Sequence, residues 1–380
     1  MTPPKRELSR TEKLDWLRLI RTENVGPVTF RHLLTRFGSA ASALAALPDL
    51  AHRGGRTQPL KVFPRSAAER ELTELEQLHG WLTAFIEPDY PSALAAVDDA
   101  PPLIAVLGQA QVLTRPAVAI VGARNASANG RHFAGKLAQE IGAGGYTIAS
   151  GLARGIDSAA HQAALPTGTV AVVAGGIDVI YPPENESLYR AIAERGVVVA
   201  EMPLGTVPQA RHFPRRNRLI SGLSLGVVVV EAALRSGSLI TARFALEQGR
   251  EVFAVPGSPL DPRSAGANGL IREGATLIEN GNDVLSALRA SKPPLSSRDE
   301  LRFTASTGSD PAEQEVTAAR PLLLDLLSLE PVAVDELLRA CPFSPAAVQT
   351  VLLELELAGR LARHPGNRVS LLAAGMLVPS

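Results

Sequence analysis

Six short apolar runs between residues 117 and 255 limit most strongly what this chain can fold into. Stretches with helical character separate the runs, which cover 117–121, 146–149, 169–174, 197–200, 226–230 and 251–255. The runs are rich in β-branched residues and do not alternate with polar ones, which is typical of strands buried on both faces. Strands and helices that alternate at this spacing predict a doubly wound, mostly parallel α/β sheet.

The residues on either side of this region predict two smaller modules. In the N-terminal part, Val25-Gly26-Pro27 separates two amphipathic helical stretches, as in a helix-hairpin-helix or SAM-like module. Such a hairpin can offer backbone N–H groups to DNA phosphates, and it can equally be an ordinary packing unit. Near the C-terminus, three helical stretches precede a short segment with a turn at Pro365-Gly366-Asn367, which outlines a winged helix.

These patterns divide the chain into four expected segments, and 291–314 has the Pro, Ser, Gly and charge content of a linker. The segments are an N-terminal helical SAM-like module over 1–95, an extended Rossmann-like domain over 96–290, a linker over 291–314 and a winged-helix-like domain over 315–380.

Composition restricts the function in a few ways. The formal net charge is zero, so an argument for nucleic-acid binding must come from local clusters. The single cysteine, Cys341, excludes an internal disulfide and a cysteine-based zinc cluster. The start of the sequence has no apolar segment typical of a secretory signal, and no apolar run approaches the length of a membrane span. We expect a cytoplasmic protein without a membrane partner or a metal.

Ligands bind to open α/β sheets outside the carboxyl ends of the strands, so the loops after the strands are the candidate sites. After the first strand, Gly122 lets the backbone approach a phosphate, Arg124 adds a bidentate donor, and a helix start offers free N–H groups. Gly151 follows the second strand. Beyond it, Asp157 and His161 stand four residues apart, and we interpret them as a hydrogen-bonded structural pair.

The segment from Met202 to Val230 contains no acidic residue. Within it the sequence places one aromatic and four basic side chains in eight positions: Arg211, Phe213, Arg215, Arg216 and Arg218. Guanidinium groups hold phosphates and a ring offers a platform for bases, so this composition is typical of a single-strand site. We expect at least one of Arg216 and Arg218 to stabilise the fold instead, through Glu231 or Glu201.

The loop after the fifth strand, Ser236-Gly237-Ser238, can present N–H and hydroxyl donors to an oxyanion. Several such loops at one sheet edge suit a polyanion better than a single nucleotide. This interpretation assumes that the loops converge.

Six motifs in order resemble those of the DNA-processing protein A (DprA/Smf) family. They are VGARNAS, SGLARGIDSAAH, YPPEN, FPRRNRLISGLS, EAALRSGSLITARFALEQGREVFAVPGSP and GANGLIREGA. The resemblance implies single-stranded DNA binding through Arg124, Phe213 and its basic neighbours, with Gly151 and the Ser236-Gly237-Ser238 loop as further anion-holding positions. It also implies a homodimer that loads the RecA recombinase onto DNA during natural transformation. No catalytic residue comes with it, and we expect no cofactor.

Two other functions stay open on the residues alone. A nucleotide-binding Rossmann hydrolase, similar to nucleoside-monophosphate phosphoribohydrolases, would use the stretch from Gly237 to Thr241, but a second glycine and the expected catalytic glutamate are missing. A sequence-specific winged-helix regulator would need basic side chains on 345–358, which instead carries Glu354 and Glu356. We therefore expect that helix to contact protein or to support the fold.

Overall fold

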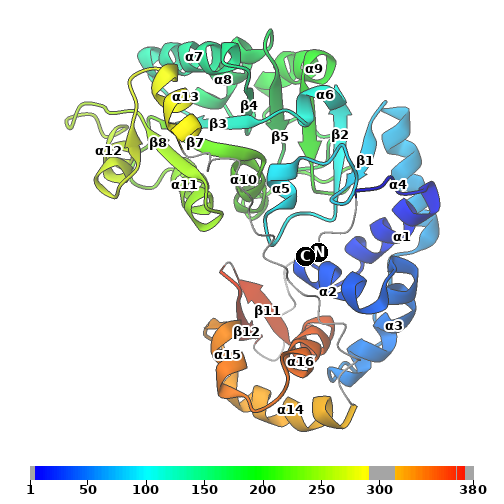
Figure 1. The fold of residues 1–380 in the computed structure, drawn as a ribbon. Helices are drawn as coiled ribbons and strands as arrows, with labels where there is room; N and C mark the ends of the chain where they lie inside the picture. Colours follow the sequence, from blue (N-terminus) through cyan, green and yellow to red (C-terminus); the bar gives the residue numbers. More distant parts are fainter. Residues whose placement is uncertain (1–4, 291–312, 365, 373–380) are drawn as a thin grey trace. The chain divides into compact units, whose positions relative to one another are not determined.

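The computed structural model describes residues 5–290, 313–364 and 366–372, and they form two compact units (Figure 1). Unit 1 contains Leu8–Arg70 together with the described residues from 313 onward. Unit 2 contains the described residues from Glu71 to 290, joined by a short N-terminal segment up to Glu7. The linker expected over 291–314 lies almost wholly outside the described residues. Within the described parts of the chain, no helix combines the length and the apolar character needed to cross a membrane.

A nine-stranded sheet in the order β1-β2-β6-β5-β4-β3-β7-β8-β9 forms the centre of unit 2. Its strands are β1 (Trp81–Ala84), β2 (Leu103–Gly108), β3 (Ala117–Gly122), β4 (Thr147–Ser150), β5 (Thr169–Val172), β6 (Val197–Ala200), β7 (Ser224–Val230), β8 (Glu251–Ala254) and β9 (Thr276–Leu277). The strands from β6 to β9 in this order pair in parallel, whereas β1 with β2 and β2 with β6 are antiparallel. The mostly parallel α/β sheet is confirmed.

Helices cover both faces of this sheet (Figure 1). They are α4 (Arg65–Gln77), α5 (Ser92–Ala95), α6 (Ala110–Leu113), α7 (Ala128–Ala143), α8 (Ile156–Ala164), α9 (Glu186–Arg195), α10 (His212–Leu223), α11 (Gly237–Glu247), α12 (Ala265–Arg272) and α13 (Gly281–Ala290), with a 3₁₀ turn at Pro183–Asn185. α7, α8 and α9 lie on one face, and α10 and α11 lie on the other. The core between α7, α8 and the central strands is aliphatic apart from two aromatic side chains, Tyr146 and Phe253.

The six strands predicted from the apolar runs are all present, as β3 to β8. Two antiparallel strands, β1 and β2, extend the sheet beyond the predicted set. Because β1 pairs with β2, residues 71–95 belong to the sheet unit, and the N-terminal helical unit ends at Arg70 rather than near residue 95.

Unit 1 combines the helical module with a winged helix. The helical module consists of α1 (Arg10–Arg21), α2 (Pro27–Phe37) and α3 (Ala40–Arg53). The winged helix consists of α14 (Glu313–Leu326), β10 (Val332–Ala333), α15 (Val334–Ala340), α16 (Pro345–Leu357), β11 (Leu361–His364) and β12 (Arg368–Leu371). Both expected modules are confirmed as folds.

Local signals explain where the helices of unit 1 begin. Ser9 and Glu12 form a reciprocal capping box at the start of α1. Pro27 and Pro345 occupy the first turns of α2 and α16, where a missing N–H costs nothing. α16 packs against α14 within the winged helix and also against α3, so the two ends of the chain build one unit.

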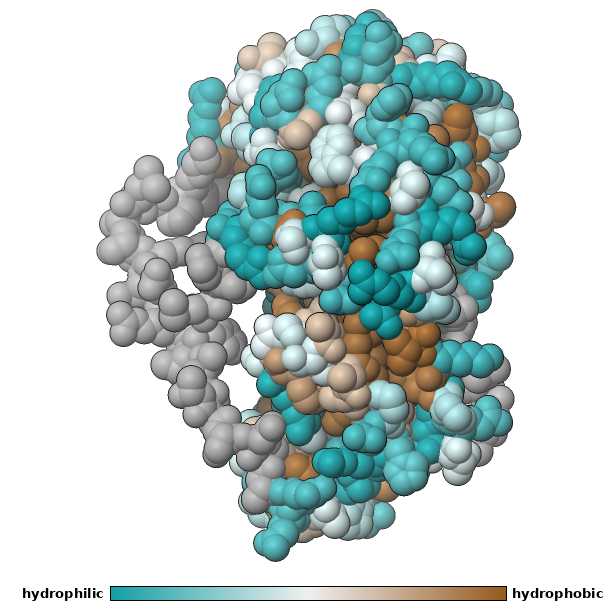
Figure 2. All heavy atoms as spheres, turned by 90° about the vertical axis from the view of Figure 1, so that its right-hand side faces the viewer, coloured by the Kyte–Doolittle hydropathy of each residue, from teal (hydrophilic) through white to brown (hydrophobic). Residues whose placement is uncertain are grey.

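Figure 2 shows one face of the molecule, on which hydrophilic side chains dominate. Among the described residues, the large apolar side chains that are most exposed are Leu234, Val207, Leu329 and above all Leu260.

Candidate nucleic-acid interface

A pocket of about 190 Å³ opens at the carboxyl ends of β3, β4 and β5. Its lining includes Arg124, Gly151, Arg154, Tyr181, Phe213 and Arg216. β3 pairs with β4 on one side and β7 on the other, so the chain reverses its direction of winding beside the pocket. Such a switch point is where open α/β sheets bind ligands. The pocket is smaller than the roughly 300–1,000 Å³ of ordinary small-molecule sites, which suits a single base better than a whole dinucleotide.

An arginine and an aromatic ring from distant parts of the sequence meet in this pocket. Arg124, in the loop after β3, places its guanidinium 5.1 Å from the ring centroid of Phe213, on the first turn of α10. Arg124 is exposed and Phe213 is half-buried. A guanidinium that stacks on a ring keeps its N–H groups free for phosphate. The structure therefore unites the two side chains that the sequence singled out most strongly.

Arg216 lies beside the same ring but is buried, at 6% exposure. Its Nη1 donates to the carbonyl oxygens of Gly151 and, at 2.9 Å, of Val172. Burial lowers its pKa to about 10, which still leaves it charged at neutral pH. A Cβ at Gly151 would overlap this guanidinium. The glycine therefore makes room for Arg216, and the arginine ties the ends of β4 and β5 together.

Asp157 and His161 are both buried, but no hydrogen bond between them is found, so the predicted pairing is wrong. Asp157 Oδ2 accepts from the backbone N–H groups of Gly151 at 3.1 Å and Ala153 at 3.3 Å. His161 Nδ1 lies 2.7 Å from Thr169 Oγ1. Burial raises the pKa of Asp157 against the opposing charge of Arg216, and burial followed by that same charge lowers the pKa of His161 to about 3. The imidazole is therefore neutral.

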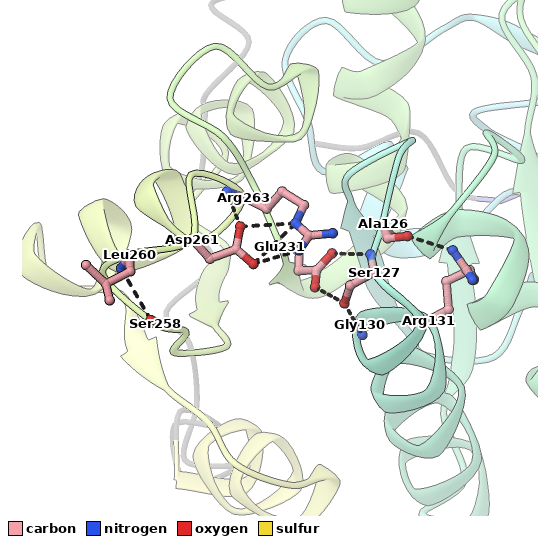
Figure 3. A network of polar contacts seen from close by, with 9 residues as sticks. All are labelled: Ala126, Ser127, Gly130, Arg131, Glu231, Ser258, Leu260, Asp261 and Arg263. Atoms are coloured by element: carbon pink, nitrogen blue, oxygen red, sulfur yellow. Dashed lines mark hydrogen bonds and ion pairs between the residues drawn. The ribbon is translucent and has the colours of Figure 1, made fainter.

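The helix start after β3 is not free for a phosphate, contrary to our expectation. Figure 3 shows the Glu231 carboxylate accepting from Ser127, through its backbone N–H at 2.8 Å and through its hydroxyl. Ser127 Oγ in turn accepts from the N–H of Gly130 at 2.9 Å and so caps α7. An internal anion therefore occupies the positive end of this helix. Gly122 has a packing role as well, because a Cβ there would overlap the carbonyl oxygen of Val230 on β7.

The Ser236-Gly237-Ser238 loop begins α11 and does not line the pocket. Ser236 Oγ caps the helix by accepting from the N–H of Ser238, and the two hydroxyls lie 2.7 Å apart. Asn217 of α10 donates to the carbonyl of Gly237 at 3.3 Å. The loop therefore neighbours α10, and Gly237 is exposed, with open space where a Cβ would lie.

Arg218 stabilises the fold, as we expected of one arginine in this cluster. Its Nη2 donates to Glu201, and its Nη1 donates to the backbone carbonyl of Asp99. The nearby carboxylates of Glu201 and Asp99 raise its pKa against the effect of burial. Arg218 is held by these partners and does not line the pocket.

Arg211 and Arg215 are exposed at the start of α10 and keep the positive charge at the surface. Burial lowers the pKa of the intervening His212, and the charges of Arg211 and Arg215 lower it further. The basic segment therefore separates into exposed members and buried ones.

Sequence reasoning missed two side chains of the pocket. Tyr181, at 45% exposure, has its ring centroid 5.9 Å from that of Phe213. Arg154 pairs at 3.5 Å with Glu184 at the rim. The signal that could have found Tyr181 was an aromatic residue in the loop after β5, within the motif YPPEN. Among the described residues, no group of three His, Cys, Asp or Glu side chains could hold a metal ion.

Comparisons with known proteins define the class. The family profile described as DNA recombination-mediator protein A matches residues 81–289. A DprA-like N-terminal HHH domain matches 10–73, and a DprA winged helix domain matches 307–367. Fold and site together thus define a DNA-processing protein.

Individual relatives agree with this assignment. Protein Smf of Escherichia coli is 42% identical over 312 residues, covering 81% of this chain and 82% of its own. The X-ray structure of DprA from Streptococcus pneumoniae superposes with a TM-score of 0.63 at 36% identity, covering 74% of this chain and 98% of the other. The structure of DprA from Helicobacter pylori, described as giving insight into its single-stranded DNA binding mode, superposes with a TM-score of 0.51 at 30% identity. The match covers 56% of this chain and 98% of the other. The chain belongs to the DNA recombination-mediator protein A family.

Proposed function

We propose that this protein binds single-stranded DNA at the pocket around Phe213, protects the strand and loads RecA onto it during natural transformation. The observation that carries the proposal is the Arg124 guanidinium stacked at 5.1 Å on the Phe213 ring in an open pocket. A ring and exposed guanidiniums provide what an unpaired strand needs, namely base stacking and phosphate contacts without a sequence code. Duplex bases are already stacked on each other and are not available to the ring.

The same geometry supports DNA binding without catalysis of a reaction. The buried Asp157 and His161 are directed to backbone and hydroxyl partners inside the fold, and neither lines the pocket. A phosphoribohydrolase-like function has little support, since the carboxylate of Glu231 occupies the start of α7 and Ser236 caps α11. Action in the cytoplasm and as a homodimer is part of the proposal and rests on family membership alone.

Replacing Arg124 or Arg211 by alanine should weaken binding of labelled single-stranded oligonucleotides to a similar degree for all sequences. Each lost phosphate contact should also flatten the plot of log affinity against log salt by about 0.7. The measurement is a fluorescence titration at several salt concentrations. Arg243→Ala, which removes an exposed arginine paired with Glu247 on α11, is the matched control and should leave both quantities unchanged. Unchanged affinity in both test variants would count against this site.

RecA loading is tested on strands already covered by single-strand binding protein. We expect the full chain to shorten the lag before RecA filaments form, and we expect Arg124→Ala to remove that effect in proportion to its loss of DNA affinity. A wild-type chain that binds DNA and leaves the lag unchanged contradicts the loading role while leaving the binding role intact.

A further inference from the structure

Helix α16 occupies the position of the recognition helix in the winged helix, yet it is covered on all sides beyond its first turns. Every residue from Thr350 to Leu357 is buried, including Glu354 and Glu356. One side packs into the core of the winged helix, where Val348, Val351 and Leu355 lie. The opposite side packs against α3 and α2 of the helical module. A recognition helix that reads DNA needs its outer face free for the major groove.

Close backbone contact joins the two modules. A Cβ built on Gly54, at the end of α3, would overlap the carbonyl oxygen of Glu354 on α16. From the other direction, Arg360 Nη1 donates to the carbonyl of Gly54 at 3.3 Å. Arg36 of α2 donates to Thr350 Oγ1 of α16 at 3.4 Å. The absence of a side chain at Gly54 is thus what permits α3 to approach α16.

The hairpin between α1 and α2 takes part in the same contact. Asn24, at its tip, has a left-handed φ of 62°, and its Nδ2 donates to the carbonyl of Leu357 at 3.2 Å. That carbonyl belongs to the last turn of α16 and has no partner within the helix. Hairpins of this kind hold DNA phosphates with the backbone N–H groups of their tip. Here the tip of the hairpin contacts the end of α16 instead.

Charge favours protein over DNA as the partner of α16. The helix has no lysine or arginine, and its carboxylates Glu354 and Glu356 pair with Arg320 and Arg363 of the winged helix. His32, on α2, is partly buried; desolvation and then the charge of Arg363 lower its pKa to about 4. Even an uncovered α16 would present acidic rather than basic side chains to a phosphate backbone.

We propose that the outer face of α16 is a docking surface for the N-terminal helical module, and that docking withholds the α1–α2 hairpin from nucleic acid. The winged helix of this chain then acts as a protein clamp rather than as a DNA reader. The inference does not depend on the pocket around Phe213, which belongs to unit 2.

Gly54→Ala tests the masking directly. Gly54 has φ −69° and ψ −4°, which alanine adopts freely, so the change acts through the overlap of the new Cβ with Glu354 and Ala358. In an Arg124→Ala background, we expect faster hydrogen exchange at the hairpin and along α16. We also expect affinity for a labelled duplex at low salt to rise by about fivefold or more, the effect of one or two backbone hydrogen bonds to phosphate. Ala45→Leu adds a larger side chain at an exposed site on the same helix and should change neither quantity. Faster exchange without a gain in duplex affinity would overturn the masking.

A second experiment keeps the wild-type contact intact. A protease recognition sequence is inserted between Ala290 and Glu313, the full chain is cut there, and the products are separated by gel filtration. The fragment that carries the winged helix should co-elute with the rest of the chain, and in Gly54→Ala it should elute separately. Separation of the wild-type fragments would overturn the docking surface.

Discussion

Replacing Arg216 by methionine is expected to lower the free energy of unfolding of unit 2 by about 3–5 kcal/mol, the usual effect of leaving a buried charge without its opposing charge. The change leaves the Asp157 carboxylate buried without its facing cation. It also removes the donor shared by the carbonyls of Gly151 and Val172, which joins the ends of β4 and β5. Hydrogen exchange of the amides in β4 and β5 reports on unit 2 by itself and is the appropriate measurement.

Arg215→Met is the matched control, because the preceding arginine is exposed and loses only surface charge. It should leave the exchange of β4 and β5 within about 0.5 kcal/mol of the wild-type value. Asp157→Asn combined with Arg216→Met should recover part of the loss, since it removes the uncompensated charge. Arg216→Met with stability close to wild type would show that the buried guanidinium does not hold the site together.

Phe213→Ala is expected to weaken binding of single-stranded oligonucleotides by about 1–3 kcal/mol, the contribution of stacking one base on an aromatic ring. This corresponds to a loss of roughly 5- to 150-fold in affinity. The salt dependence should stay as in the wild type, because no phosphate contact is removed, and that separates this variant from Arg124→Ala. Titration of a labelled oligonucleotide at two salt concentrations measures both quantities.

Phe213→Tyr keeps the ring and should retain most of the affinity. Tyr181→Ala provides a further comparison, since that ring lies 5.9 Å from Phe213 and is nearly half exposed. If Phe213→Ala binds as tightly as Phe213→Tyr, base stacking at this ring is contradicted. Such a result would leave phosphate contacts by the exposed arginines as the remaining basis for binding.

The buried strands could be predicted because few other structures would accommodate their sequences. Runs such as Val227–Val230, apolar and β-branched, are stable only with both faces covered, and this requirement implies the flanking helices. β1 was harder to foresee because it has four residues and pairs only with β2 at the edge of the sheet. Its place depends on a partner strand some twenty residues further on, which local pattern does not reveal.

The candidate site could be predicted in part. Topology alone implied that Arg124 and Phe213 would approach each other, because both follow strands at one edge of a parallel sheet. The role of each glycine could not be read in the same way. A glycine that admits a guanidinium, as Gly151 does for Arg216, has the same sequence signature as one that admits a phosphate. The carboxylate of Glu231 at the start of α7 likewise depends on a contact across the fold.

The packing of α3 against α16 makes unit 2 an insertion between the two halves of unit 1. A pulling force applied to α1 and β12 would therefore load the contact between α3 and α16 before it reached the nine-stranded sheet. The helical module and the winged helix would separate first. The pocket around Phe213 would keep its shape until then.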